Sequence, residues 1–265
     1  MGRHELEYPK DATNTVKRHD ERGIYALRTI HELINASLIL HISFNTEGSP
    51  FPTTLPMLGQ MGSFARPSSS TGDPLDLYVH GYVSSRLMSL GRKHSDQDGQ
   101  KTETGLPVCV AASHVDGLVL ALSSFSHSYN YRSAILFGYA TLVTDVEEKN
   151  YALEQITNGI VHDRWSHTRL PLTNAELQST SVLRIRIVSG SAKIRTGNAK
   201  DDRDDLQNDE LRDGNWTGVL PVYSSIGTPV DSDYNKVEVP AHVSEFIEEF
   251  NRESREYCVE AIKKK

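Results

Sequence analysis

The centre of the chain, residues 107–144, limits the possible folds most strongly. It consists of apolar runs whose length and composition are typical of β-strands. Residues 107–115 and 118–125 are separated only by Asp116 and Gly117, and an Asp-Gly pair between strands favours a two-residue hairpin turn. Residues 131–144 form a third long run. Because strands joined by a hairpin are antiparallel, this region predicts an antiparallel sheet.

A second hairpin is predicted closer to the N-terminus. Residues 37–44 and 51–58 are strand-like and flank a cluster of turn-forming residues. Pro52 and Pro56 lack backbone N–H groups. The second strand must therefore lie at a sheet edge, or leave backbone positions without a partner strand where a ligand approaches. The remaining predicted strands are residues 75–80 and 182–188.

Helical periodicity is found between these strands and at the C-terminus. Residues 23–35, 84–90 and 147–159 favour helices, and an amphipathic helix is expected from about Val243 to the terminal lysines. Segments that are polar or rich in Gly, Ser and Pro predict loops at residues 59–74, 91–105 and 198–213. About six strands linked by hairpins, with irregularly inserted helices, favour an antiparallel barrel or sandwich over a doubly wound α/β fold.

Composition narrows the possible partners and the compartment. With 28 Lys and Arg against 35 Asp and Glu, the net charge of −7 argues against nucleic acid, which prefers a basic surface. No apolar run approaches the roughly 20 residues that cross a bilayer, so we expect no membrane span. Cys109 and Cys258 form neither a disulfide framework nor a metal-binding pattern, and the N-terminus lacks a secretory signal. We therefore predict a cytoplasmic protein.

The first candidate site is the stretch Tyr-Val-His-Gly-Tyr-Val-Ser-Ser-Arg at residues 78–86. A strand is predicted to end near Gly81, and a helix to begin near Ser85 and Arg86. Free N–H groups at a helix N-terminus, a hydroxyl and a guanidinium together can bind a phosphate. The alternative is a helix-capping serine followed by a surface arginine.

Two further polar clusters follow predicted strands. Residues 126–133 read Ser-His-Ser-Tyr-Asn-Tyr-Arg-Ser and suit a ring-shaped ligand with many acceptors, or form a polar connecting loop. Residues 189–197 carry Lys193 and Arg195 between glycines, which indicates an anion contact or a solvated cationic turn. The chain has no Rossmann, P-loop or nucleophile-elbow motif. Its histidines form no H-E-x-x-H pattern, and we predict no metal site.

Taken in order, these three clusters resemble the flavin-nucleotide-binding branch of the pyridoxamine 5′-phosphate oxidase-like family, which includes nitroimidazole-resistance proteins. The resemblance extends from about Lys17 to Pro221. It implies a mainly β (α+β) fold, an antiparallel split β-barrel with peripheral helices, which binds FMN at the interface of a homodimer. We then expect an N-terminal arm at residues 1–22, an FMN-binding split-barrel domain at 23–230 and a C-terminal extension at 231–265.

The same resemblance assigns roles to individual residues. Ser85 and Arg86 would hold the FMN phosphate, with His80 and Gly81 near the ring and the phosphate. The backbone of Thr53, Thr54 and Leu55 would face the flavin. The other residues expected to contact the cofactor are Asn130, Tyr131, Arg132, Ser133, Lys193 and Arg195. The chain departs from the oxidases proper because Thr53, Thr54 and Leu55 stand where those enzymes carry basic residues.

The resemblance therefore implies a homodimeric FMN-dependent oxidoreductase that transfers a hydride or electron pair between the flavin and a small organic substrate. His80 would donate a proton, because the ordinary pKa of an imidazole is near neutrality. Lys193 or Arg195 would stabilise the reduced flavin. The alternative is a non-catalytic protein that binds flavin or haem, with His80 or His127 as an axial haem ligand.

Overall fold

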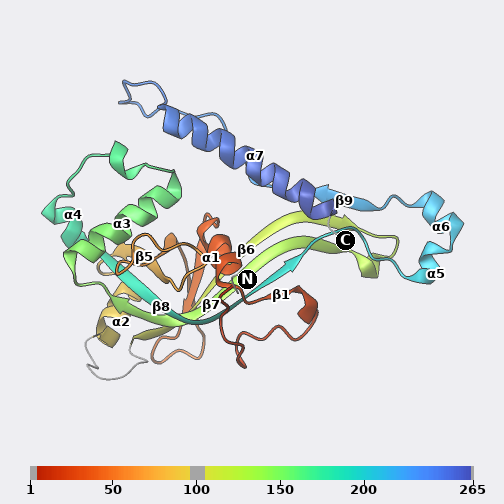
Figure 1. The fold of residues 1–265 in the computed structure, drawn as a ribbon, viewed down its shortest axis with the longest axis horizontal. Coiled ribbons are helices and arrows are strands. Elements are labelled where there is room, and N and C mark those ends of the chain that lie inside the picture. The colour runs from red at the N-terminus through yellow and green to blue at the C-terminus, as the bar shows by residue number, and fades with distance from the viewer. Residues whose placement is uncertain (1–4, 96–104, 264–265) are drawn as a thin grey trace. The chain divides into compact units, whose positions relative to one another are not determined.

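The computed structural model describes residues 5–95 and 105–263, which form two compact units. Unit 1 comprises Met1–Ala112 and Ser133–Ala192, and unit 2 comprises Ser113–Arg132 and Lys193–Lys265. Three long strands, β6, β7 and β8, labelled in Figure 1, contribute residues to both units. Each unit is described separately below.

The described strands form a nine-stranded sheet, in which the pairs β2–β3, β2–β6, β4–β5, β5–β8 and β6–β9 are antiparallel, as predicted. Its main path runs β3-β2-β6-β7-β8-β5-β4, while β1 pairs with β8 and β9 with β6. The strands are β1 Gly23–Ile24, β2 Leu40–Phe44, β3 Thr53–Met57, β4 Gly59–Gly62, β5 Asp76–Tyr82, β6 Leu106–Leu120, β7 Ser128–Leu142, β8 Thr180–Arg195 and β9 Gly218–Pro221.

The α-helices lie between the strands in the chain order or after the last strand. They are α1 Leu27–Asn35, α2 Arg86–Ser95, α3 Val146–Ile160, α4 Asn174–Ser179, α5 Arg203–Leu206, α6 Asp209–Gly214 and α7 Ala241–Lys263. Three short 3₁₀ helices are η1 Asp20–Arg22, η2 Ser124–Ser126 and η3 Trp165–His167. The helices predicted at 23–35, 147–159 and the C-terminus are present with small shifts of their ends.

The predicted hairpin between residues 37–44 and 51–58 is confirmed by the pairing of β2 with β3. Ile42 lies opposite Leu55, and Ser43 lies opposite Thr54, with 2.9 Å between their hydroxyl oxygens. β3 stands at one end of the strand order, so Pro56 is accommodated at an edge, the first of the two predicted options, and Pro52 precedes the strand.

The predicted turn at Asp116 and Gly117 is wrong, because β6 continues through both residues. The Asp116 side chain is buried and accepts hydrogen bonds from Arg132 instead of forming a turn. A Cβ on Gly117 would lie 2.7 Å from Val219 Cγ1, so the glycine allows close approach of β9. A strand can contain this pair when a partner satisfies the carboxylate and crowding excludes a larger residue.

Other predicted loops are also partly ordered into regular structure. β4 lies within the predicted loop 59–74, and α2 extends into the predicted loop 91–105, of which residues 96–104 lie outside the described chain. The short helices α5 and α6 occupy the predicted loop 198–213. The polar stretch 189–197 is not a turn, because β8 continues to Arg195.

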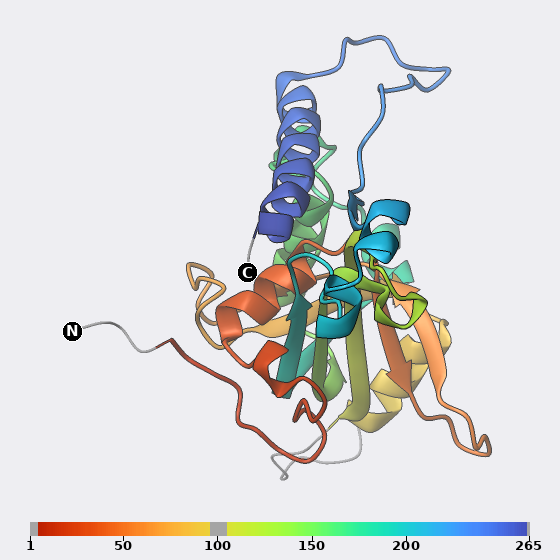
Figure 2. The same ribbon diagram turned by 90° about the vertical axis from the view of Figure 1, so that its right-hand side faces the viewer.

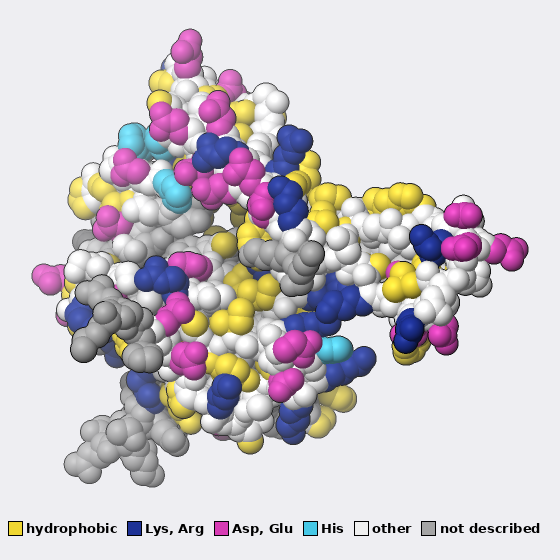
Figure 3. Space-filling model, turned by 45° about the vertical axis from the view of Figure 1, so that its right-hand side comes forward, with side chains coloured by type: hydrophobic (Ala, Val, Ile, Leu, Met, Phe, Trp, Pro, Cys, Tyr) yellow, Lys and Arg dark blue, Asp and Glu magenta, His cyan; other side chains and the backbone are white. Residues whose placement is uncertain are grey.

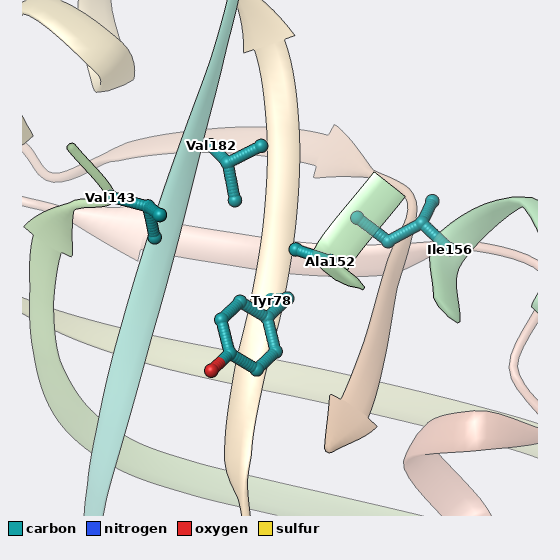
Figure 4. Packing of buried hydrophobic residues seen from close by; sticks show 5 residues of the cluster. All are labelled: Tyr78, Val143, Ala152, Ile156 and Val182. Carbon is teal, nitrogen blue, oxygen red and sulfur yellow. The ribbon is translucent and has the colours of Figure 1, made fainter. Parts of the chain in front are cut away.

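In unit 1, α2 and α3 lie on opposite faces of the β5–β8 pair. α3 contributes Ala152 and Ile156 to a buried cluster with Tyr78, Val143 and Val182, seen in Figure 4. On the other face, α2 packs so closely that a Cβ on Gly91 would lie 2.6 Å from Leu183 Cδ2. This alternation of neighbouring residues between faces is a property of β-strands, and it decides the environment of the candidate site.

In unit 2, the predicted C-terminal amphipathic helix is confirmed as α7, a continuous helix preceded by an extended segment in Figure 2. The Asn251 amide accepts from the Ile226 N–H at 2.7 Å and donates to the Ile226 carbonyl at 2.9 Å. The Gly197 N–H donates to the Ala261 carbonyl at 2.8 Å. The middle and the C-terminal end of the helix are therefore anchored within this unit.

A close approach of β7 to β8 in unit 1 predicts a stability effect. A Cβ on Gly138 would overlap the Arg186 carbonyl oxygen and lie 2.9 Å from Ile185 Cγ2. We expect Gly138→Ala to lower the free energy of unfolding by about 1–3 kcal/mol. The matched control is Gly214→Ala, where an added Cβ would meet no heavy atom of the described residues within 4 Å beyond its own helix and chain neighbours, with an expected change of about 0.5 kcal/mol or less. Urea unfolding of both variants measures the difference, and equal stabilities would contradict it.

Candidate functional site

The junction between β5 and α2 brings Gly81, Ser85 and Arg86 close together in the chain and in space. The Ser85 N–H donates to the Tyr82 carbonyl at 2.9 Å, which forms the turn before α2 begins at Arg86. A Cβ on Gly81 would lie 3.6 Å from Ser85 Oγ and 3.1 Å from Met88 Cε. Gly81 thus lets the start of α2 pack closely on the strand. The first N–H groups of any α-helix have no acceptor within the helix, and those of α2 lie at this junction.

Arg86 is exposed at this helix N-terminus. In the described part of the chain, no carboxylate lies within ion-pair distance of its guanidinium. A guanidinium beside unsatisfied N–H groups and the Ser85 hydroxyl is an arrangement that suits a phosphate.

His80 points away from this junction. It lies opposite Val182 and on the same face of β5 as Tyr78, whereas the following residue, Gly81, faces α2. Its Nδ1 atom is buried without a hydrogen-bond partner in the described residues, and burial lowers the pKa of His80. The lowered pKa disfavours the protonated ring, which is the form that the predicted proton donor requires.

Thr53, Thr54 and Leu55 lie on the edge strand β3, where Thr54 is exposed and the other two are half-buried. The Thr54 hydroxyl contacts Ser43, as described above. Pro56, which follows in the same strand, has no backbone N–H and so cannot donate a hydrogen bond to β2 or to a ligand. The backbone of β3 therefore has one donor fewer than acceptors, because Pro56 has only its carbonyl.

Asn130 and Arg195, both predicted to contact the cofactor, contact each other in unit 2. Arg195 donates to the Asn130 side-chain carbonyl at 2.5 Å and to the Asn198 backbone carbonyl at 3.3 Å. The Asn130 amide donates to the Gly197 carbonyl at 2.9 Å. Both side chains are buried, so these bonds hold the end of β8 against β7.

Arg132 is also engaged within unit 2. It binds Asp116 through two nitrogens, at 2.7 Å from Nη2 and 3.0 Å from Nε, and its guanidinium carbon lies 3.6 Å from the centre of the Tyr257 ring. The sequence interpretation missed Asp116 and Tyr257. One signal was present, because Asp116 is the only charged residue between 106 and 122 and needs a partner when buried.

The remaining candidates are half-buried: Tyr131 and Ser133 on β7 and Lys193 on β8. The candidates therefore belong to separate groups. Unit 1 contains the β5–α2 junction, β3 and Ser133, and unit 2 contains the Asn130–Arg195 pair, Tyr131, Arg132 and Lys193.

The surface, the helices and the titratable side chains add three observations. Acidic and basic side chains are interspersed over the face shown in Figure 3. Among the helices that the structure describes, none has the length and apolar character needed to cross a bilayer. Within the same residues, no three His, Cys, Asp or Glu side chains are grouped so that they could hold a metal ion.

Comparison with known proteins identifies the family. The sequence profile described as pyridoxamine 5′-phosphate oxidase matches residues 27–194, more than half of the chain, and the chain belongs to this family. Its fold is the split barrel of that family, with an open antiparallel sheet and several helices. No curated protein matches the sequence.

Two solved structures are similar over most of their length. The flavocytochrome Anf3 from Azotobacter vinelandii is 27% identical with a TM-score of 0.69, covering 91% of this chain and 99% of its own. A FAD and haem binding protein from Mycobacterium smegmatis is 24% identical with a TM-score of 0.68, covering 85% and 97%. The second similarity supports the fold alone.

Proposed function

We propose that this chain is a flavin-binding oxidoreductase that uses FMN and transfers a hydride or an electron pair to or from a small organic substrate. The observation that carries the proposal is the family match over residues 27–194, which includes every candidate cofactor residue except Arg195. Similarity to a flavocytochrome over nearly the whole chain supports it. A flavin supplies the redox chemistry, so a catalytic triad or carboxylate pair is not needed.

The β5–α2 junction fits the phosphate of a flavin nucleotide. Ser85, Arg86 and the first N–H groups of α2 would bind it, and Gly81 keeps the strand free of a side chain at this point. The carbonyl groups of β3 would accept from the flavin ring. Because His80 faces the opposite side of β5, a proton transfer through it requires substrate to approach from that side.

Replacing Arg86 tests the phosphate assignment. We expect Arg86→Ala to weaken FMN binding by about 10–100-fold, the effect of losing a hydrogen bond to a charged group. The control is Arg252→Ala, which removes an exposed arginine of α7. Fluorescence titration with FMN and with FAD measures both affinities and identifies the preferred flavin. Unchanged FMN affinity in Arg86→Ala would contradict the assignment, and a colourless wild type that takes up neither flavin would contradict the proposed function.

We also propose a homodimer, in which Lys193 or Arg195 stabilises the reduced flavin. This assembly is supported by the family resemblance alone. Size-exclusion chromatography with light scattering should give the flavin-loaded protein twice the chain mass of 29.6 kDa. A monomer that retains flavin would contradict the dimer without affecting the cofactor assignment.

A second candidate function is that the chain binds haem, with or without flavin. The specific observation in its favour is the similarity to a flavocytochrome at 27% identity. A Soret band in the purified or haem-reconstituted protein would support it, and its absence after addition of excess haem would exclude it.

A further inference from the structure

Arg92 lies on α2 in unit 1, and its side chain reaches back toward the start of that helix. Its Nη2 atom donates to the Val83 carbonyl at 3.4 Å and to the Ser181 hydroxyl at 3.5 Å. Val83 precedes α2, and side chains of a helix generally lean toward its N-terminus. The guanidinium of Arg92 therefore contacts the turn that leads into Ser85 and Arg86.

The contact with Ser181 places the Arg92 guanidinium on the same face of the sheet as Gly81. Ser181 is buried on β8 and lies directly opposite Gly81 where β5 pairs with β8. Directly opposed residues of an antiparallel pair present their side chains on the same face, and Gly81 faces α2. The sequence interpretation missed both Arg92 and Ser181, because they are 89 positions apart and meet only when β8 pairs with β5.

The positive charge at this junction is not balanced by the described chain. Residues 77–95 contain no Asp or Glu, and no carboxylate of the described residues lies within ion-pair distance of Arg86 or Arg92. Arg86 begins α2 and Arg92 contacts the turn before it, so both charges add to the positive end of the helix dipole. The junction therefore attracts an anion.

Arg92 also has hydrogen-bond donors available for that anion. A guanidinium has five N–H groups, and within the described residues only the Nη2 atom of Arg92 has hydrogen-bond partners. Both partners are neutral and both bonds are long, so they orient the group without neutralising its charge. Arg92 is half-buried, which makes a positive charge without a counter-ion costly and a bound anion stabilising.

The phosphate of FMN matches two arginines better than one. The second pKa of a phosphate monoester is about 6, so the group carries nearly two negative charges at pH 7. Arg86 alone supplies one positive charge. A second guanidinium would balance the other negative charge, and its planar fork suits the phosphate oxygens.

We propose that Arg92 binds the phosphate of the flavin nucleotide as a second cation beside Arg86, oriented by the Val83 carbonyl and the Ser181 hydroxyl. The inference rests on the proposed function and adds to its phosphate site a residue that comes from the middle of α2.

Fluorescence titration of the full chain with FMN and with riboflavin tests the proposal, because riboflavin has the same ring system without the phosphate. Arg92→Ala should weaken FMN binding by about 10–100-fold and leave riboflavin affinity unchanged. Arg92→Lys should keep most of the FMN affinity, since an ammonium also binds phosphate. The matched control is Lys93→Ala, which removes the exposed positive charge of the next residue and should bind both ligands as wild type does. Thermal unfolding of each variant confirms that it is folded.

The outcomes separate this inference from the proposed function. Equal losses of FMN and riboflavin affinity in Arg92→Ala would mean that Arg92 only supports the structure of the junction, and would overturn the inference. Equal losses of FMN affinity in Arg92→Ala and Lys93→Ala would also overturn it. A wild type that binds FMN with an affinity independent of Arg92 would overturn the inference alone and leave the proposed function standing. A wild type that takes up neither ligand would overturn both.

Discussion

Asp116→Ala should lower the free energy of unfolding by about 3–5 kcal/mol, the cost of leaving a buried charge unpaired. The Asp116 side chain is 3% exposed and that of its partner Arg132 is 18% exposed. Alanine would remove the acceptor of both guanidinium contacts and leave the cation between the sheet and the Tyr257 ring. Urea unfolding, followed by circular dichroism, measures the change.

Two further variants identify the cause of this loss. Asp209→Ala breaks an ion pair with Arg212 that is exposed on both sides, and it should cost less than about 1 kcal/mol. The double variant Asp116→Leu with Arg132→Met replaces both buried charges, so it should recover much of the stability lost in Asp116→Ala. If Asp116→Ala and Asp209→Ala cost the same, the buried pair is not important for stability.

The fold could be predicted where the controlling interactions are local. The hairpin of β2 and β3 follows from two strand-like runs around a turn, and α7 follows from the spacing of its apolar residues. Asp116 was assigned to a turn because an Asp-Gly pair between two strand-like runs favours a hairpin turn. Its partner lies 16 residues away, and the aromatic ring that covers that partner lies on α7, so no local pattern indicates either contact.

In the candidate site too, features set by local sequence were predicted and features set by contacts distant in the sequence were not. Ser85 and Arg86 were predicted near a helix start, and α2 begins there because the strand and turn signals are local. The sequence interpretation placed His80 and Gly81 together, although neighbouring residues of a strand face opposite sides. The bond between Asn130 and Arg195 joins residues 65 positions apart and depends on which strands are neighbours, which the sequence did not specify.

A second large effect is expected from His31, which is 0% exposed on α1. Its Nδ1–H donates to the Thr71 carbonyl at 2.8 Å, and its Nε2 accepts from the Tyr8 hydroxyl at 2.6 Å. Burial lowers the pKa of His31 from 6.5 to about 4, opposed by the bond to Thr71. Protonation would also break the bond from Tyr8, since Nε2 could then no longer accept.

The lowered pKa makes stability depend on pH in a defined direction. Between pH 6.5 and about 4 the unfolded chain binds a proton at His31 and the folded chain does not, so stability falls as the pH falls through this window. The shift corresponds to about 3 kcal/mol at pH 4 relative to pH 7. We expect the stability advantage of wild type over His31→Gln, measured by urea unfolding, to shrink by about this amount over the window. His41→Gln, which changes an exposed histidine, is the matched control. An advantage that is the same at pH 7 and pH 4 would mean that His31 accepts a proton in the folded protein as readily as in the unfolded chain.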